Sequence, residues 1–520
     1  MKKWLLLSVL SSTALAAAFP PSRLGFMAYW ALVPFFVLLD SGSYKHAIKW
    51  GYITGLFLNM WTLYWINWVT LPGMIGAILY LPVFYVIYAV FHTFLRKRLG
   101  KPWLFVCIPF LWTGVEYLRT LGVLGFPWTS LAYTQTYYLS LIQYAPVTSL
   151  YGVSFWIVTL NVIIWALFAY AGQYRRVVWL YTLLLILLLF PWIYGKFVIP
   201  KDSDQVEKVR VAVVQGNIDP FAKSDSDFWD TNFEIYDRLS REAMKLRPEM
   251  MIWPETAVPC YLRYTPTYKD KVTNLVDNIG IPLITGAHDA VFKKSGGYNT
   301  YNAVFLIRPH NSAMPIYAKL HLVPFGERVP FTEVFPQLKA FLESFELGEG
   351  NFSPGNKLVT FKFQAGSDDT QKKRVKIPIG VCFESLFPDL IRKFIVNENA
   401  NLLGIITNDG WFRRSQAPYH HAQAAVFRAI ENRISIARSA NTGISLFVDP
   451  YGHILQSSPT FEEAYLVADL PLRTETTFFT AHGNVFSVFC TIFNLGPIFV
   501  AMFQDNKEDS SDKTVVSIHT

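Results

Sequence analysis

The chain consists of long apolar stretches on either side of one long stretch of mixed polarity. A helix needs roughly 20 apolar residues to cross the hydrocarbon core of a bilayer. Seven such stretches precede residue 200, at about 4–20, 24–40, 50–70, 73–95, 102–119, 147–171 and 177–198, and an eighth covers about 482–503. We therefore predict a membrane domain of seven transmembrane helices over 1–200, a globular domain over 205–475, a closing transmembrane helix over 480–503 and a polar cytoplasmic tail over 504–520.

The first apolar stretch has two interpretations. Lys2 and Lys3, followed by an apolar run and the small residues of 14–18, also fit a secretory signal peptide. We expect this segment to be retained as a span. Under either interpretation residue 20 lies outside the cytoplasm, so the predicted orientation does not depend on the choice.

Basic residues in the short loops predict the orientation, because Lys and Arg concentrate on the cytoplasmic side of membrane proteins. With the N-terminus inside, ten basic residues lie in the cytoplasm and four lie outside. The ten are Lys2, Lys3, Lys45, Lys49, Arg96, Lys97, Arg98, Lys101, Arg175 and Arg176, and the four are Arg23, Arg119, Lys196 and Lys201. Seven crossings then place 205–475 outside the cytoplasm.

The globular stretch alternates between two periodicities. Short runs rich in β-branched residues at 209–215, 250–253, 281–286, 375–382 and 402–407 predict strands, and 228–246, 268–278 and 417–432 have helical spacing. Apolar strands separated by helices are typical of a layered α/β domain whose strands are buried on both faces.

The composition supports a chain of two parts and excludes some functions. Apolar residues make up 52% and charged residues 16%, which is too apolar for a purely soluble protein. The net charge of +8 comes from basic residues that flank apolar segments, so we expect no nucleic-acid binding. Of the four cysteines, Cys107 and Cys490 lie in apolar runs, and Cys260 and Cys382 lie in the globular stretch. We expect no disulfide between the latter two.

Ionisable residues of unlike kind follow the predicted strands, where functional groups of α/β domains tend to lie. They are Glu255, Lys319, Glu327, Cys382 and Glu384. A cysteine thiol that passes its proton to a carboxylate is a nucleophile, and an ammonium group stabilises the oxyanion of a tetrahedral intermediate. Taken singly, each residue has a more ordinary explanation as a core cysteine, a helix cap or a surface charge.

The order of these residues resembles the nitrilase (carbon–nitrogen hydrolase) superfamily. Glu255, Lys319 and Cys382 follow one another at intervals of 64 and 63 residues. Further matching segments lie at 214–218, 253–256, 321–327, 407–412, 428–433 and 441–445. Together with seven spans, an outer domain and a closing span, they resemble the apolipoprotein N-acyltransferase family over nearly the whole chain.

The resemblance implies a role for each residue. Cys382 would be the nucleophile, Glu255 the general base and acid, and Lys319 the stabiliser of the oxyanion. Two carboxylates, Glu327 and Glu384, would support the lysine and the thiol. In addition, Trp411 would line the path of the acyl chain or the acceptor.

The implied fold is a multi-span α-helical membrane bundle plus an α/β nitrilase-like αββα sandwich. The implied reaction is ping-pong: an acyl chain passes from a phospholipid, from the sn-1 position of phosphatidylethanolamine, through a cysteine thioester to the amine of a diacylated apolipoprotein. An enzyme embedded in the bilayer does not have to expose acyl chains to water, which would cost about 0.8 kcal/mol per CH₂. We expect a monomer without cofactor or metal in the bacterial cytoplasmic (inner) membrane, with its active site on the periplasmic side.

Some positions depart from the family. Phe383 follows the nucleophile where the family usually has Tyr, and Gly410, Arg413 and 481–484 also differ. A membrane-anchored amidase and a non-enzymatic transporter or receptor remain as alternatives.

The predicted membrane domain holds two further features. Glu116 and Arg119, three residues apart at the end of a span, are expected to form an ion pair. The aromatic connection 120–146 is expected to be an interfacial belt, with a lateral lipid entry as the alternative.

Overall fold

The structure is a computed structural model that describes residues 1–200, 206–223, 225–294, 296–330, 352–366, 372–473 and 475–504. It divides into two compact units. Unit 1 comprises Met1–Tyr64, Met74–Ile199 and Asn484–Thr520, and unit 2 comprises Trp65–Gly73 and Pro200–Gly483. Apart from Gln504, the predicted tail over 504–520 lies outside the described residues.

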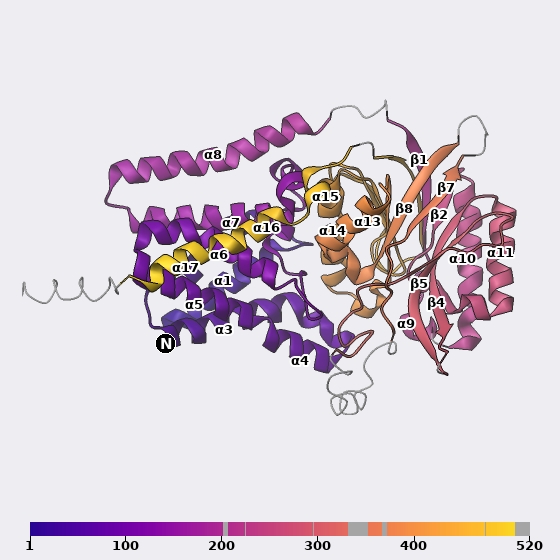
Figure 1. Ribbon diagram of the computed structural model, residues 1–520, viewed down its shortest axis with the longest axis horizontal. Helices are drawn as coiled ribbons and strands as arrows, with labels where there is room; N and C mark the ends of the chain where they lie inside the picture. The colour runs from indigo at the N-terminus through magenta and orange to yellow at the C-terminus, as the bar shows by residue number, and fades with distance from the viewer. Residues whose placement is uncertain are drawn as a thin grey trace, which may run out of the picture. The chain divides into compact units, whose positions relative to one another are not determined.

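Unit 1 is built from α-helices (Figure 1). They are α1 (Lys2–Ala18), α2 (Val33–Asp40), α3 (Tyr44–Leu63), α4 (Leu71–Tyr80), α5 (Pro82–Leu99), α6 (Lys101–Leu118), α7 (Ala145–Ala169), α8 (Tyr174–Val198), α16 (Val485–Phe493) and α17 (Leu495–Met502). By length and composition, four helical segments of the described chain are apolar enough to cross a membrane: Leu71–Leu99, Ala145–Ala169, Tyr174–Val198 and Val485–Met502.

Two predicted spans differ in their bounds. The stretch 24–40 is a 3₁₀ turn (Gly25–Tyr29) followed by the short helix α2, which restarts with Pro34 in its first turn, where a proline fits a helix. The stretch 50–70 leaves α3 at Leu63, and Trp65 belongs to unit 2, where its ring centroid lies 4.7 Å from that of Phe412. The chain continues as a 3₁₀ helix over Tyr64–Trp68, so the α-helix ends earlier than its hydropathy predicts.

The first helix packs inside unit 1. The Ser12 hydroxyl of α1 donates to the Thr54 carbonyl at 2.8 Å, and the Ser11 hydroxyl donates to the Ala31 carbonyl at 2.7 Å. Both serines are fully buried. α1 is therefore packed inside unit 1, and hydrogen bonds satisfy its buried hydroxyl groups.

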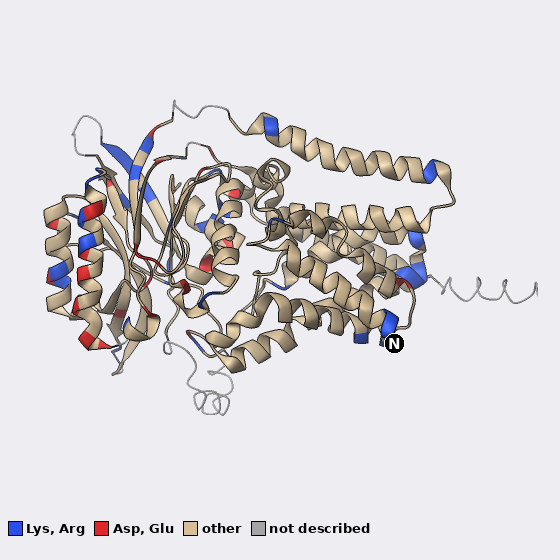
Figure 2. Cartoon of the chain, turned by 180° about the vertical axis from the view of Figure 1, so that it is seen from behind, with Lys and Arg blue, Asp and Glu red and all other residues tan. Residues whose placement is uncertain are grey.

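Basic residues gather at one end of unit 1, and its helices are otherwise almost free of charge (Figure 2). Lys101 Nζ lies 3.2 Å from the Asp40 carboxylate, Arg96 donates to the Asp40 carbonyl at 2.7 Å, and Lys97 Nζ lies 6.0 Å from the Tyr44 ring centroid. The end of α2, the start of α3, the end of α5 and the start of α6 therefore share this basic end.

Unit 2 contains two β-sheets. The first has the order β13-β1-β2-β4-β5-β6, with β3 paired to β4, and the second has the order β12-β11-β10-β9-β8-β7. The first sheet consists of β1 (Lys208–Gln215), β2 (Met250–Ile252), β3 (Val258–Tyr261), β4 (Leu283–Phe292), β5 (Tyr298–Ile307), β6 (Ile316–Ala318) and β13 (Ala464–Pro471). The second consists of β7 (Thr360–Ala365), β8 (Lys373–Val381), β9 (Leu403–Thr407), β10 (Ile436–Ala440), β11 (Leu446–Val448) and β12 (Ile454–Ser457).

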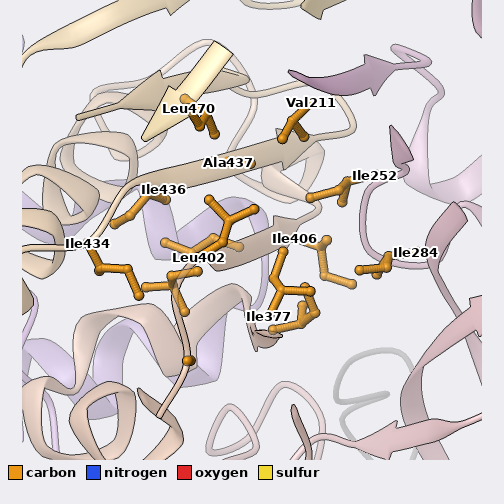
Figure 3. Close-up of a cluster of buried hydrophobic side chains, with 14 of the residues drawn as sticks. Val211, Ile252, Ile284, Ile377, Leu402, Ile406, Ile434, Ile436, Ala437 and Leu470 are labelled. Atoms are coloured by element: carbon orange, nitrogen blue, oxygen red, sulfur yellow. The ribbon is translucent and has the colours of Figure 1, made fainter. Parts of the chain in front are cut away.

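The two sheets face each other across an apolar core, and a layer of helices covers the outer face of each sheet. Val211 and Ile252 of the first sheet and Ile377 and Ile406 of the second are fully buried in one cluster (Figure 3). Helices α10 (Trp229–Met244) and α11 (Pro266–Ile279) cover the first sheet, and α13 (Pro388–Asn397) and α14 (Ala417–Asn432) cover the second (Figure 1). This is the αββα sandwich that the resemblance implied.

Parallel pairing aligns the ends of the strands that carry the candidate residues. β9 pairs in parallel with β8 and β10, and β2 pairs in parallel with β1 and β4. The carboxyl ends of neighbouring parallel strands lie at one edge of a sheet. Residues that directly follow β8, β9 and β10 are therefore brought together, although they are far apart in the sequence.

Candidate active site

Cys382 sits at a sharp turn between β8 and the 3₁₀ helix η8 (Cys382–Leu386). Its φ is +52°, a left-handed conformation that costs energy for a residue other than glycine. Hydrogen bonds hold the turn: Ser385 Oγ donates to the Cys382 carbonyl at 2.7 Å, and His421 Nε2 lies 3.0 Å from the same oxygen. The strained backbone fixes where the thiol points.

The surroundings of Cys382 keep its sulfur protonated. Burial raises the pKa of the thiol well above its usual 9.0, and the nearby Glu255 carboxylate raises it further. The Lys319 ammonium and a hydrogen bond with Thr407 act in the opposite direction without cancelling this effect. A resting thiol at neutral pH needs a base at the moment of attack.

Lys319 lies between two carboxylates. Its Nζ is 2.9 Å from Glu327 Oε1 and 3.3 Å from Glu255 Oε1, and Asn302 Nδ2 donates to both of these oxygens at 2.8 Å. The side chain of Lys319 is 1% exposed. Burial alone would lower the pKa of Lys319, but Glu327 and Glu255 raise it well above its usual value, so the group remains an ammonium ion.

Glu255 connects the two sheets. It follows β2, and its Oε2 accepts a hydrogen bond at 2.9 Å from the backbone N–H of Asn408, which follows β9. Gly286 on β4 makes room for this loop, since a Cβ there would lie 2.8 Å from the Glu255 Cα and 2.6 Å from the Thr256 nitrogen. The carboxylate is thereby held in one place between Lys319 and the end of β9.

Glu384 joins the turn of Cys382 to the segment that follows Lys319. Its Oε1 accepts from the Tyr317 hydroxyl at 2.6 Å and from the backbone N–H groups of Leu320 and His321 at 2.8 and 3.0 Å. Its Oε2 accepts from the Val381 N–H at 2.8 Å. Burial raises the pKa of Glu384 above its usual 4.5, and these donors and Lys319 oppose the rise.

Trp411 lies in the 3₁₀ helix η9 (Asp409–Phe412), directly after β9. Its side chain is partly buried, and its ring centroid is 5.2 Å from that of Phe221, which is 65% exposed. The neighbouring Phe412 is buried against Trp65. An aromatic cluster therefore continues the strand edge at which Cys382 and Asn408 lie.

A buried network behind Cys382 was missed by sequence reasoning. Asp409 Oδ1 lies 2.8 Å from His421 Nδ1, and Arg438 Nη2 donates to Asp409 Oδ2 at 2.9 Å. Burial raises the pKa of Asp409, but Arg438 and His421 more than offset this and hold it well below its usual range. The available signal was the aspartate inside the segment 407–412.

Two further predictions concerned a disulfide between Cys260 and Cys382 and a metal site, neither of which was expected. Cys260 and Cys382 are both free, and Cys260 is buried in β3. Across the described ranges, no group of three or more His, Cys, Asp or Glu side chains is placed to hold a metal ion.

Comparison with known proteins matches both parts of the chain. A family model described as the apolipoprotein N-acyltransferase N-terminal domain matches residues 11–163, and a carbon–nitrogen hydrolase model matches residues 210–478. The apolipoprotein N-acyltransferase of Geobacter metallireducens is 36% identical over 501 residues, covering 93% of this chain and 92% of the relative. That of Chlorobaculum tepidum is 33% identical over 516 residues, covering 94% and 95%.

Among solved structures, an amidase from Nesterenkonia sp. is similar at 19% identity. The match has a TM-score of 0.36 and covers 52% of this chain and 94% of the amidase.

Proposed function

Because this chain belongs to the apolipoprotein N-acyltransferase family, we propose that it moves a fatty acyl chain from a membrane phospholipid to the N-terminal amine of a diacylglyceryl-cysteine lipoprotein. The observation that carries the proposal is the strained Cys382 turn beside the buried Glu255–Lys319 pair. The N-terminal family match covers most of the helical unit, which disfavours a simply anchored amidase and a transporter.

In the first half-reaction Cys382 attacks the ester carbonyl of the phospholipid. Glu255 accepts the thiol proton as the S–C bond forms, and the Lys319 ammonium stabilises the negative oxygen of the tetrahedral intermediate. The ester C–O bond then breaks, and Glu255 returns the proton to the departing alkoxide. The products are a lysophospholipid and an acyl thioester on Cys382.

In the second half-reaction the lipoprotein amine attacks the thioester. Glu255 takes a proton from the amine while the N–C bond forms, and Lys319 stabilises the second tetrahedral oxygen. The C–S bond breaks, and the proton passes to the Cys382 sulfur. The amide product leaves, and the enzyme returns to the thiol form that the raised pKa of Cys382 favours.

The other residues position this machinery. Glu327 holds the Lys319 ammonium at 2.9 Å, and Glu384 ties the cysteine turn to the segment after Lys319. Trp411, beside the exposed ring of Phe221, offers apolar surface for the incoming acyl chain or acceptor.

The proposed setting is the bacterial cytoplasmic membrane, crossed several times, with the active site on the periplasmic side. The gathering of Arg96, Lys97 and Lys101 at one end of unit 1 supports a cytoplasmic location for that end. The buried hydrogen bonds of Ser11 and Ser12 support retention of α1 as a span. We further propose a monomer that uses the sn-1 chain of phosphatidylethanolamine.

The test is the intact mass of the detergent-purified protein after incubation with phosphatidylethanolamine. We expect a gain of one fatty acyl chain in the wild type and in the control Cys260→Ala, and none in Cys382→Ala. A diacylated lipopeptide should discharge the adduct. An adduct that water discharges equally fast would favour the amidase, and the absence of any adduct would refute the acyltransferase mechanism.

A further inference from the structure

Unit 1 contains a pocket between α5, α6 and the loop that follows α6. Tyr85, Tyr88 and Trp112 form an aromatic wall, and Glu116, Arg119 and Thr129 supply polar groups. All six side chains are buried, with exposures of 7% or less. Charged groups are costly in such a place unless something compensates them, so each one calls for an explanation.

Arg119 is buried without sufficient partners. Its exposure is 5%, and in the described chain its guanidinium makes one long hydrogen bond, from Nη2 to Ser130 Oγ at 3.5 Å. Its Nε is buried with no partner among the described residues, and the same holds for the hydroxyl of Thr129 in the same pocket. A guanidinium has five N–H donors, so most of its capacity is unused.

The prediction of an ion pair between Glu116 and Arg119 is wrong, because the Glu116 carboxylate has other partners. Glu116 Oε1 accepts from Ser154 Oγ at 2.7 Å, and Oε2 accepts from Trp112 Nε1 at 3.2 Å and from the Leu131 N–H at 3.4 Å. The carboxylate is thus satisfied by neutral donors. Arg119 has no carboxylate partner among the described residues, and an anionic ligand would supply both hydrogen-bond acceptors and a counter-charge.

The pocket lies at the end of unit 1 opposite the basic cluster. Tyr85 is in the first turn of α5 and Arg119 caps the end of α6, whereas Arg96 and Lys101 mark the other ends of these two helices. If the basic end lies in the cytoplasm, as proposed above, the pocket lies at the outer ends of α5 and α6, on the side of the outer lipid headgroups.

We propose that this pocket binds the phosphate group of a membrane glycerophospholipid. The planar guanidinium donates two parallel hydrogen bonds to phosphate oxygens, as arginine commonly does, and the Thr129 hydroxyl donates a third. Tyr85 and Trp112 pack against the glycerol and the upper part of an acyl chain. The site deepens the proposed function, and it rests on that function for the statement that the bound lipid is the acyl donor.

The experiment measures lipid binding separately from catalysis. The full-length Cys382→Ala protein in detergent is titrated by native mass spectrometry with phosphatidylethanolamine, with diacylglycerol of the same chains, and with glycerophosphoethanolamine, which has no chains. Arg119→Gln is compared with Arg23→Gln, an exposed arginine of unit 1. Because hydrogen bonds between a guanidinium and a phosphate are charge-assisted, we expect Arg119→Gln to weaken phosphatidylethanolamine binding about tenfold or more. Diacylglycerol binding should be unchanged.

Equal phosphatidylethanolamine binding by Arg119→Gln and Arg23→Gln would overturn the proposal, as would equally tight binding of glycerophosphoethanolamine. If Arg119→Gln does not fold, Thr129→Val decides: weaker phospholipid binding supports the site, and unchanged binding refutes it. Failure of this binding test leaves acyl-adduct formation on wild-type Cys382 intact, so the two proposals fail separately.

Discussion

Replacing Lys319 with methionine removes the charge that holds two buried carboxylates and keeps most of the aliphatic stem. In the wild type the ammonium lies 3.3 Å from Glu255 and 2.9 Å from Glu327, whose exposures are 5% and 7%. Breaking a buried ion pair by removing one partner costs about 3–5 kcal/mol. At roughly 2–4 °C per kcal/mol, the Tm of Lys319→Met should fall by about 6–20 °C.

The loss should depend on pH in a defined direction. The pKa of Lys319 is raised on folding, so its stabilising contribution is complete below the ordinary lysine value and is lost only as pH rises through the higher folded value. Between about pH 5 and 9 the wild-type contribution is therefore constant. In Lys319→Met the two carboxylates, both bonded to Asn302 Nδ2, repel each other, and protonation of one relieves the repulsion. The deficit should shrink as pH falls.

The assay is thermal unfolding of the detergent-purified chain across this pH range, with acyl-adduct formation measured in parallel. The double variant Lys319→Met/Glu327→Gln removes one of the repelling charges and should recover part of the stability. It should not recover activity, since losing an oxyanion donor costs about 10²–10³-fold in rate. Wild-type stability in Lys319→Met, or restored acylation in the double variant, would refute this reasoning.

Three further outcomes are expected. Tyr317→Phe removes the 2.6 Å hydrogen bond to Glu384 and should cost about 1.5–3 kcal/mol in denaturant unfolding; a neutral result would contradict a charged acceptor. Asp409→Asn leaves Arg438 without its buried counter-charge and should destabilise unit 2 by about 3–5 kcal/mol between pH 5 and 8, as limited proteolysis would show. Wild-type Asp409 has a lowered pKa, so its contribution is present above the ordinary aspartate value and is lost only as pH falls through the lower folded value. Alkylation of Cys382 by iodoacetamide should be slow at pH 7–8 and rise only above its usual pKa of 9.0, because its thiol pKa is raised; rapid labelling at pH 7 would contradict this.

The local sequence pattern predicted strands that lie in the interior of the two sheets. The five predicted strands correspond to β1, β2, β4, β8 and β9, which lie inside the two sheets, where apolar runs are continuous. Strand β12, whose four residues are all exposed, lacks such a run. Strand β13 has an apolar run over 464–468, but it is only partly buried at one edge of its sheet. β13 pairs with β1 over eight residues, a partnership between segments about 250 residues apart that no local pattern records.

The sequence by itself determined which residue types were available for chemistry. Glu255, Lys319 and Cys382 were candidates for catalysis because they lie at the ends of strands. Their order in the chain indicated the family before any contact was known. These inferences succeed because a nucleophile, a base and a cation at strand ends are local features.

Only the tertiary structure decided which strand ends meet. Asn302 bonds both carboxylates because β5 pairs with β4, and Asn408 reaches Glu255 because the two sheets face each other. It also gave Glu116 and Arg119 different hydrogen-bond partners, although their spacing alone predicted an ion pair. The reason is physical: hydrogen-bond partners in a folded domain are set by strand pairing and layer packing between distant segments, and a single sequence contains the groups without their neighbours.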